Sequence, residues 1–267
     1  MISYIDMDLW VRVAGFFKDT LKSNPATDGS DMTISITYDN NQYNRLCKAG
    51  WGFSSLIRIG DKSILFDTGA EGRILLHNME KMQIKPQTID GIFLSHQHWD
   101  HTGGLTDLLK ANQKAGLYLL DSFSKDFVDK LELSGRKITR IDSPAHISNG
   151  IHSTGPLGTE IKEQALVAET EKGLVVICGC AHPGVTTIAE KAREILDRNI
   201  YILLGGFHLL ERKNSGIKSI INQLRDLEVR KVGPCHCTGY AAIDMFKKEY
   251  KKDFIEIGAG RLISLEA

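Results

Sequence analysis

Residues 94–104, which read LSHQHWDHTGG, bring four side chains that can bind a metal into six consecutive positions. These are His96, His98, Asp100 and His101, and they directly follow an apolar strand predicted over residues 91–95. Alternation along an extended or turning backbone points His96 and His98 the same way and puts the other two one step further round the turn. Packing gives no reason to gather such polar groups at a strand end. The segment therefore predicts two neighbouring metal positions supplied by one loop.

The composition is that of a folded globular protein. The chain has 267 residues, of which 42% are hydrophobic, and its 33 Lys and Arg balance 33 Asp and Glu. This length allows one large α/β domain. A net charge of zero lacks the basic excess of a nucleic-acid binder, so we expect a small-molecule substrate and no nucleic-acid partner.

Cysteine usage and hydropathy bear on the compartment. The five cysteines are an odd number, and four fall in two Cys-x-Cys pairs, 178/180 and 235/237, whose spacing is poor for a disulfide framework. The longest apolar runs fall far short of the roughly 20 residues that cross a bilayer, and the first residues lack the order of a signal peptide. We expect a cytoplasmic protein with no membrane contact.

Two regions are predicted along the chain. Residues 1–30 form an amphipathic helix extension, with Leu9, Val13, Phe16, Phe17 and Leu21 on one face, that is a candidate for homodimer contacts. Residues 31–267 form one domain, β-rich at first and with strands separated by helices after residue 100. The later predicted helices are 124–131, with Ser124 as a cap, 186–196, 215–227 and 241–250, and the later strands include 174–178, 200–204 and 254–257.

The metal-binding loop resembles the signature of the metallo-beta-lactamase superfamily. Asp67, in the segment SILFDTG (63–69), matches the superfamily's Asp at the end of an earlier strand, and His236, in GPCHCTG (233–239), matches its last ligand histidine. The segments CGCAHPG (178–184) and LGGFHL (204–209) are similar to a subgroup described as dihydropterin ribofuranosylaminobenzene phosphate synthases. The resemblance implies an α/β (α+β) fold, a four-layer αβ/βα sandwich with the metal site at the sheet edge between two sheets.

The same resemblance implies a ligand set for two divalent metal ions. The first metal would be held by His96, His98 and His182, and the second by Asp100, His101 and His236. Asp67 would orient a ligand histidine from outside this set. Nitrogen-rich sites of this kind suit zinc, with iron or manganese as alternatives.

One position departs from the superfamily's pattern. Most members have a metal-bridging Asp in a Gly-Asp pair where this chain has Gly179-Cys180. Cys180 is therefore either a thiolate ligand or a small buried residue beside the metals. Members also take a ligand histidine from before the strand at 174–178, where this chain has only His146 and His152. We expect His182 to replace it, with His152 as the alternative.

Outside the ligand set, His208 is the candidate catalytic residue, alongside the ligand Asp100. His208 follows an apolar strand and two glycines, and in phosphodiesterase branches of the superfamily a non-ligand histidine occupies this place in the order. It would protonate a leaving group or stabilise developing charge; the alternative is a core histidine. Trp51 is expected in the core, and Trp99 is a candidate pocket wall.

These residues together favour metal-dependent hydrolysis, or transfer, on a small molecule by a metal-activated hydroxide. The resemblance and His208 favour a phosphate ester or diester. Two alternatives remain open. Iron in the same ligands, with cysteines nearby, would make a redox enzyme, and the missing bridging Asp would fit a metabolite-binding protein with weak catalysis.

Overall fold

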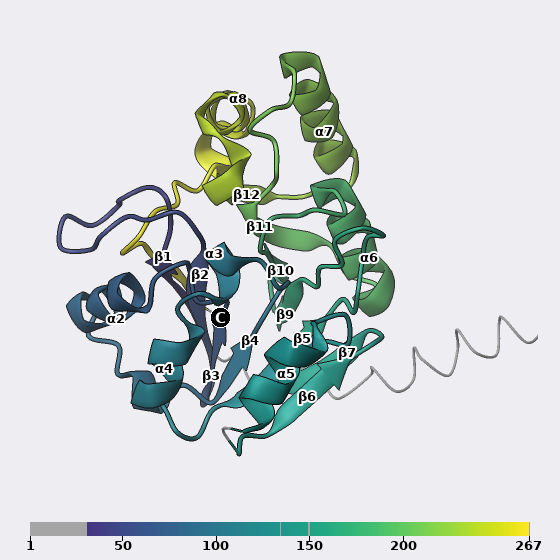
Figure 1. Ribbon diagram of the computed structural model, residues 1–267. Helices are drawn as coiled ribbons and strands as arrows, with labels where there is room; N and C mark the ends of the chain where they lie inside the picture. Colours follow the sequence, from purple (N-terminus) through teal and green to yellow (C-terminus); the bar gives the residue numbers. More distant parts are fainter. Residues whose placement is uncertain (1–30, 134, 149, 267) are drawn as a thin grey trace, which may run out of the picture.

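The computed structural model describes residues 31–133, 135–148 and 150–266. The predicted helix of residues 1–30, and with it the proposed dimer contact, lies outside the described residues. Two mixed β-sheets lie face to face, and helices lie on their outer sides (Figure 1). This is the four-layer αβ/βα arrangement, so the predicted fold class is confirmed.

The first sheet contains seven strands in the order β13-β1-β2-β3-β4-β5-β6. Neighbours from β3 to β6 are parallel, and the pairs from β13 to β3 are antiparallel. The bounds are β1 Met32–Tyr38, β2 Ser54–Ile59, β3 Lys62–Phe66, β4 Gly91–Phe93, β5 Gly116–Leu120, β6 Ile138–Ile141 and β13 Leu262–Leu265.

The second sheet contains six strands in the order β12-β11-β10-β9-β8-β7. Strands β10, β11 and β12 are parallel, and β7 to β10 pair antiparallel. The bounds are β7 Ala145–Ser148, β8 Ile151–Ser153, β9 Leu166–Thr170, β10 Gly173–Cys178, β11 Ile200–Gly206 and β12 Lys231–Cys235. The strand predicted over 254–257 is absent, because only Phe254 forms a single bridge there, with Val232.

The helices divide between the two sheets. Helices α2 and α4 pack together beside the first sheet, and α6, α7 and α8 cover the second (Figure 1). Ser124 caps α5 as predicted, since its side chain accepts the N–H of Phe127. The bounds are α2 Gly72–Lys81, α3 Trp99–Thr102, α4 Leu105–Ala111, α5 Lys125–Glu132, α6 Val185–Leu196, α7 Asn214–Asp226 and α8 Tyr240–Tyr250, with short 3₁₀ turns η1 Pro86–Thr88, η2 His236–Thr238 and η3 Lys251–Asp253. Among the described residues, no helix has the length and apolar character to span a membrane.

Strand β10 shows why the layers form. Its side chains alternate, so that Val175 and Ile177 join the core between the sheets while Leu174 and Val176 join the core under the outer helices. A strand buried on both faces has an uninterrupted apolar sequence, as this one does.

The parallel strands place the functional loops. Strands β3 and β4 in one sheet run parallel to each other, as do β10, β11 and β12 in the other, so the carboxyl ends within each set meet at one sheet edge. Loops that leave this edge carry the histidine-rich segment and the segments at 179–182, 207–208 and 236–238. Ligand sites of α/β sheets form at such edges.

Buried aromatic side chains in the core beneath this edge are expected to stabilise the fold. Phe66 is fully buried and its ring stacks on that of Phe93 at a centroid distance of 5.6 Å. We expect Phe66→Ala to lower the free energy of unfolding by about 3–5 kcal/mol, since it removes apolar contacts and leaves a cavity. Urea unfolding followed by circular dichroism measures this. The exposed Leu46 provides a control, and Leu46→Ala should change stability by less than about 0.5 kcal/mol; equal effects of the two changes would contradict the assignment of this core.

Candidate metal centre

Three chain segments supply the donor side chains. His96 and His98 lie in the loop after β4, and Asp100 and His101 lie on the single turn of α3 that follows. His182 and Cys180 lie in the loop after β10, and His236 begins the 3₁₀ turn after β12. The structure brings all the predicted ligand residues to one place at the sheet edge.

The first donor set consists of His96, His98 and His182, with one nitrogen of each within 4.8 Å of the others. The ring of His182 lies 4.9 Å from each of the other two rings, measured between centroids. Nε2 of His96 and Nδ1 of His98 are 3.1 Å apart. Three converging imidazoles are a frequent zinc donor set.

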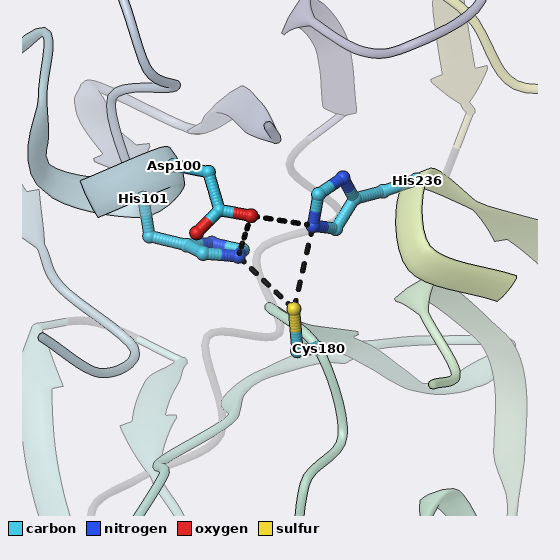
Figure 2. A group of neighbouring side chains, drawn as sticks. All are labelled: Asp100, His101, Cys180 and His236. Carbon is cyan, nitrogen blue, oxygen red and sulfur yellow. Dashed lines mark hydrogen bonds and ion pairs between the residues drawn. The ribbon is translucent and has the colours of Figure 1, made fainter. Parts of the chain in front are cut away.

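The second donor set consists of Asp100, His101, His236 and the sulfur of Cys180 (Figure 2). An Asp100 carboxylate oxygen lies 3.3 Å from Nε2 of His236 and 3.8 Å from Nε2 of His101. The sulfur lies 3.1 Å from Nε2 of His101 and 3.3 Å from Nε2 of His236. Four donor atoms from three segments therefore face one point.

Asp67 fixes two of these histidines. Its carboxylate is fully buried, accepts Nδ1–H of His101 at 2.7 Å, and accepts both the N–H and the hydroxyl of Ser95 at 2.7 Å. Because the hydroxyl hydrogen of Ser95 is used there, its oxygen accepts Nδ1–H of His96 at 2.9 Å. Nε2 of His96 and of His101 therefore faces the donor sets, which is the ring orientation that metal ligation through Nε2 requires.

Asn40 does the same for His236. Its side-chain oxygen accepts the N–H of Gly52 at 2.9 Å and Nδ1–H of His236 at 3.0 Å, and its amide donates to the carbonyl of His236. The Gly52 contact fixes the orientation of the amide, because only the oxygen can accept. Nε2 of His236 therefore points into the second donor set as an acceptor. No local sequence pattern indicates this role, since Asn40 lies in a turn of the kind where Asn is common.

Glu163 is the second residue that sequence reasoning missed. It is fully buried, and one carboxylate oxygen accepts the N–H groups of residues 179, 180 and 181 at 2.9–3.0 Å. The other oxygen accepts the N–H of His182 at 2.9 Å. This carboxylate thus shapes the loop that presents both Cys180 and His182. Its sequence neighbourhood is polar and loop-like, so only its burial distinguishes it.

Burial and neighbouring charges shift the pKa values of the donor side chains. Burial and the neighbouring imidazoles lower the pKa of His96 well below its usual range and the pKa of His182 to about 4. Burial also opposes a charge on His101, but the Asp67 and Asp100 carboxylates outweigh it and raise the pKa to about 9. Burial raises the pKa of Asp100, and its contacts with His236 and His101 more than reverse this, so that the net shift is downward.

The donor atoms fit divalent metal ions. Nε2 of His182 is buried and has no hydrogen-bond partner among the described residues, although it lies in a cluster of polar groups. Buried polar atoms without partners are uncommon. The Nε2 atoms of His96, His101 and His236 face the same two donor sets, so the nitrogens that converge there are of the kind that binds a divalent ion.

His208 lies beside the donor sets. It is exposed, its ring centroid is 4.5 Å from that of His182, and it lines a cavity of about 380 Å³ with Trp51, Leu210, Glu211, Arg212 and Cys237. A hydrogen bond with Cys237 raises its pKa. His208 is therefore not a core histidine. A second cavity, of about 340 Å³, shares Trp51 and Leu210 and reaches His236.

The structure does not favour the alternative ligand His152, and it contradicts the expectation that Trp51 lies in the core. His152, the alternative ligand, is buried on β8, where it contacts Glu169 at 2.9 Å, and it belongs to neither donor set. Trp51 is not in the core: it is 46% exposed, and its ring edge lies over His236 at a centroid distance of 5.3 Å. The local sequence pattern does not reveal which face of a sheet a side chain occupies, or whether it reaches the surface beside the metal centre. Trp99 is 63% exposed.

The backbone is unusual at the centre. Asp67, Ala181, His208 and His236 each follow a strand end and have φ between +50° and +55°, a region that non-glycine residues seldom adopt. Gly179 has a steric requirement, because a Cβ there would lie 2.3 Å from the hydroxyl oxygen of Ser95. Strain of this kind is often found at functional sites.

Comparisons with known proteins agree with this geometry. Residues 50–145 match the model of the metallo-beta-lactamase superfamily. The chain is 31% identical to a protein of Methanocaldococcus jannaschii, over 86% of this chain and 95% of that protein. The chain therefore belongs to the metallo-beta-lactamase superfamily, whose fold binds divalent metals.

The similar proteins include one named enzyme and two solved structures. The Methanocaldococcus jannaschii protein is named 7,8-dihydropterin-6-methyl-4-(beta-D-ribofuranosyl)-aminobenzene-5'-phosphate synthase. Among solved structures, the chain is similar to Tm1679, described as a metal-dependent hydrolase of the beta-lactamase superfamily, with a TM-score of 0.72, 28% identity, and coverage of 88% of this chain and 100% of that one. The fold also matches the metallo-beta-lactamase fold protein YhfI from Bacillus subtilis, with a TM-score of 0.65, 16% identity, and coverage of 88% and 99%.

Glu163 gives a test of how the centre is held. In Glu163→Gln one carboxylate oxygen becomes an NH₂ group, which cannot accept a backbone N–H from the 179–182 loop. We expect metal affinity to fall about 10- to 100-fold, the usual effect of losing a group that orients ligands. Competition with a chromogenic chelator measures the affinity. Glu169→Gln, which makes the same change at a partly buried carboxylate away from this loop, is the control, and equal losses in both variants would contradict the role of Glu163.

Proposed function

We propose that this chain is a metal-dependent hydrolase or group transferase that acts on a small phosphorylated substrate at two divalent metal ions. The observation that carries the proposal is the pair of adjacent donor sets, His96/His98/His182 and Asp100/His101/His236 with Cys180, next to an exposed histidine in a cavity. The nitrogen-rich donors favour zinc, and iron or manganese are the alternatives. Bound metal ions would lower the pKa of a water molecule and polarise the oxygen of the group under attack.

His208 is the residue proposed to transfer a proton. Its ring is on the cavity wall and 4.5 Å from the ring of His182, so it can reach a leaving group held at the donor sets. An imidazole in this place donates a proton as the bond to the leaving group breaks. Asp100 contributes charge, because its carboxylate faces both His101 and His236.

The cavities favour a small substrate. Volumes of about 380 and 340 Å³ are in the range of small-molecule pockets. Arg212 lines the cavity that holds His208 and offers a guanidinium to a phosphate, while Glu211 beside it would disfavour a highly charged polyanion. With no net charge on the whole chain, this favours a phosphorylated metabolite over a nucleic acid.

The synthase relative supports transfer as a form of the same reaction. The name of that relative describes formation of a phosphorylated ribofuranosyl aminobenzene compound, and this chain is 31% identical to it. Attack by water gives hydrolysis, and attack by a second substrate gives transfer, with the same donor residues. The apolar surface of Trp51 and Leu210 between the two cavities could hold the ring of such a second substrate.

Metal analysis is the first test. We expect about two zinc ions per chain in tag-free protein by plasma mass spectrometry, and loss of one in His182→Ala, because that imidazole is one of only three donors in its set. His152→Ala is the matched control and should retain the wild-type content. Iron would favour the redox alternative, and a metal-free protein that binds a metabolite would favour the binding alternative.

A second test concerns His208. We expect His208→Ala to lower kcat on a chromogenic phosphodiester or phosphomonoester by about 10²- to 10⁴-fold, since proton transfer to the leaving group is lost. Metal content should not change. His146→Ala, at an exposed histidine on β7, should retain full activity. Unchanged turnover in His208→Ala would rule out the catalytic role.

A further inference from the structure

The sulfur of Cys180 has a position that packing does not explain. The side chain is only 3% exposed, and its closest polar neighbours are Nε2 of His101 at 3.1 Å and Nε2 of His236 at 3.3 Å. Cys178, two residues earlier, shows what a structural cysteine looks like in this chain. It lies among apolar side chains under the outer helices, and its thiol faces the carbonyls of Leu204 and Gly206.

Four of the six separations between the atoms of the second donor set are close to those of a tetrahedral site. With metal bonds of about 2.0 Å to nitrogen and oxygen and about 2.3 Å to sulfur, donor atoms are separated by about 3.3 Å, or about 3.5 Å when one is sulfur. The separations that join the Asp100 oxygen and the sulfur to the two imidazole nitrogens are 3.1, 3.3, 3.3 and 3.8 Å (Figure 2). One cation can contact all four atoms with little movement.

Too few hydrogens point into this space. His101 and His236 use Nδ1–H outside the set, on Asp67 and Asn40, so both Nε2 atoms face inward as acceptors, as does the Asp100 carboxylate. The thiol hydrogen of Cys180 can satisfy one acceptor at most. A cation bound to a deprotonated sulfur satisfies all four atoms.

The loop backbone holds the sulfur in this place. The N–H of Cys180 donates to the buried Glu163 carboxylate at 3.0 Å, together with the N–H groups on either side. Ala181, with φ of +55°, then turns the chain so that His182 enters the first donor set. The same loop therefore supplies one donor to each set.

We propose that Cys180 is a thiolate ligand of the second metal ion, which is then held by two imidazoles, one carboxylate and one sulfur. The inference rests on the proposed function only in requiring a divalent cation at this position. A sulfur donor makes the second position softer than the all-nitrogen first position. It favours zinc, cobalt or cadmium over manganese and magnesium, which prefer oxygen donors.

Cys237 is the rival sulfur. It lies within 4.8 Å of Cys180 and His208 and forms a third group with them, but it is not a member of the set that contains His101 and His236. Its thiol faces the carbonyl of Cys180 at 3.6 Å. A variant at Cys237 is therefore a matched control of the same chemistry and burial.

Cobalt(II) added to metal-free protein tests the proposal, because a cobalt–thiolate bond has a near-ultraviolet charge-transfer absorption that nitrogen and oxygen donors lack. We expect this absorption in wild type and in Cys237→Ser, and its loss in Cys180→Ser. Cobalt affinity at one of the two positions should fall on the order of 10- to 100-fold or more in Cys180→Ser. Cys180→Asp keeps a charged donor, and should bind cobalt without the absorption and with a higher affinity for manganese than wild type.

The possible results distinguish a wrong assignment of the sulfur ligand from the absence of a metal centre. Two cobalt ions bound to wild type without the absorption, or an absorption that persists in Cys180→Ser, would overturn the sulfur ligand and leave the metal centre intact. An absorption lost in Cys237→Ser but kept in Cys180→Ser would assign the sulfur to Cys237 and also overturn the proposal. No bound cobalt in wild-type protein of native circular dichroism would instead contradict the proposed function, and the inference with it.

Discussion

The buried carboxylate of Asp67 is the contact on which the metal centre depends. It lies directly after β3 and accepts hydrogen bonds from the backbone and hydroxyl of Ser95 and from Nδ1–H of His101. It therefore joins the end of β3 to the loop after β4, which carries Ser95, and to helix α3, which carries His101. A buried charge is tolerated only when donors surround it. Because all its partners are donors, His101 directs its Nδ1–H at this carboxylate and its Nε2 at the second donor set.

Glu163 imposes the matching constraint in the second half of the molecule. It is another fully buried carboxylate, and it collects four consecutive backbone N–H groups, from Gly179 to His182. Asp67 thus orders the donors that leave the first sheet, and Glu163 orders those that leave the second. Each half of the chain contributes candidate ligands to both donor sets. The centre therefore forms only when the two sheets pack face to face.

This arrangement concentrates unfavourable features at one edge. Four non-glycine residues with positive φ, an imidazole nitrogen without a hydrogen-bond partner and several mutually lowered histidine pKa values all occur there. The cores on either side of the second sheet are by contrast apolar and well packed. A rigid fold can hold such a strained, lone-pair-rich site in place, and bound cations would relieve its electrostatic cost.

The sequence by itself determined the local features: the uninterrupted apolar run of β10, the helices after residue 120, and four metal-binding side chains within one short loop. These rest on interactions between residues close in the chain, which a pattern records. Tertiary structure alone decided the rest. The contact between His101 and Cys180 joins residues 79 apart, and that between Cys180 and His236 joins residues 56 apart. Likewise, the roles of Glu163 and Asn40, the exclusion of His152 and the exposure of Trp51 depend on how two sheets meet, because burial and hydrogen-bond partners exist only once distant segments have packed together.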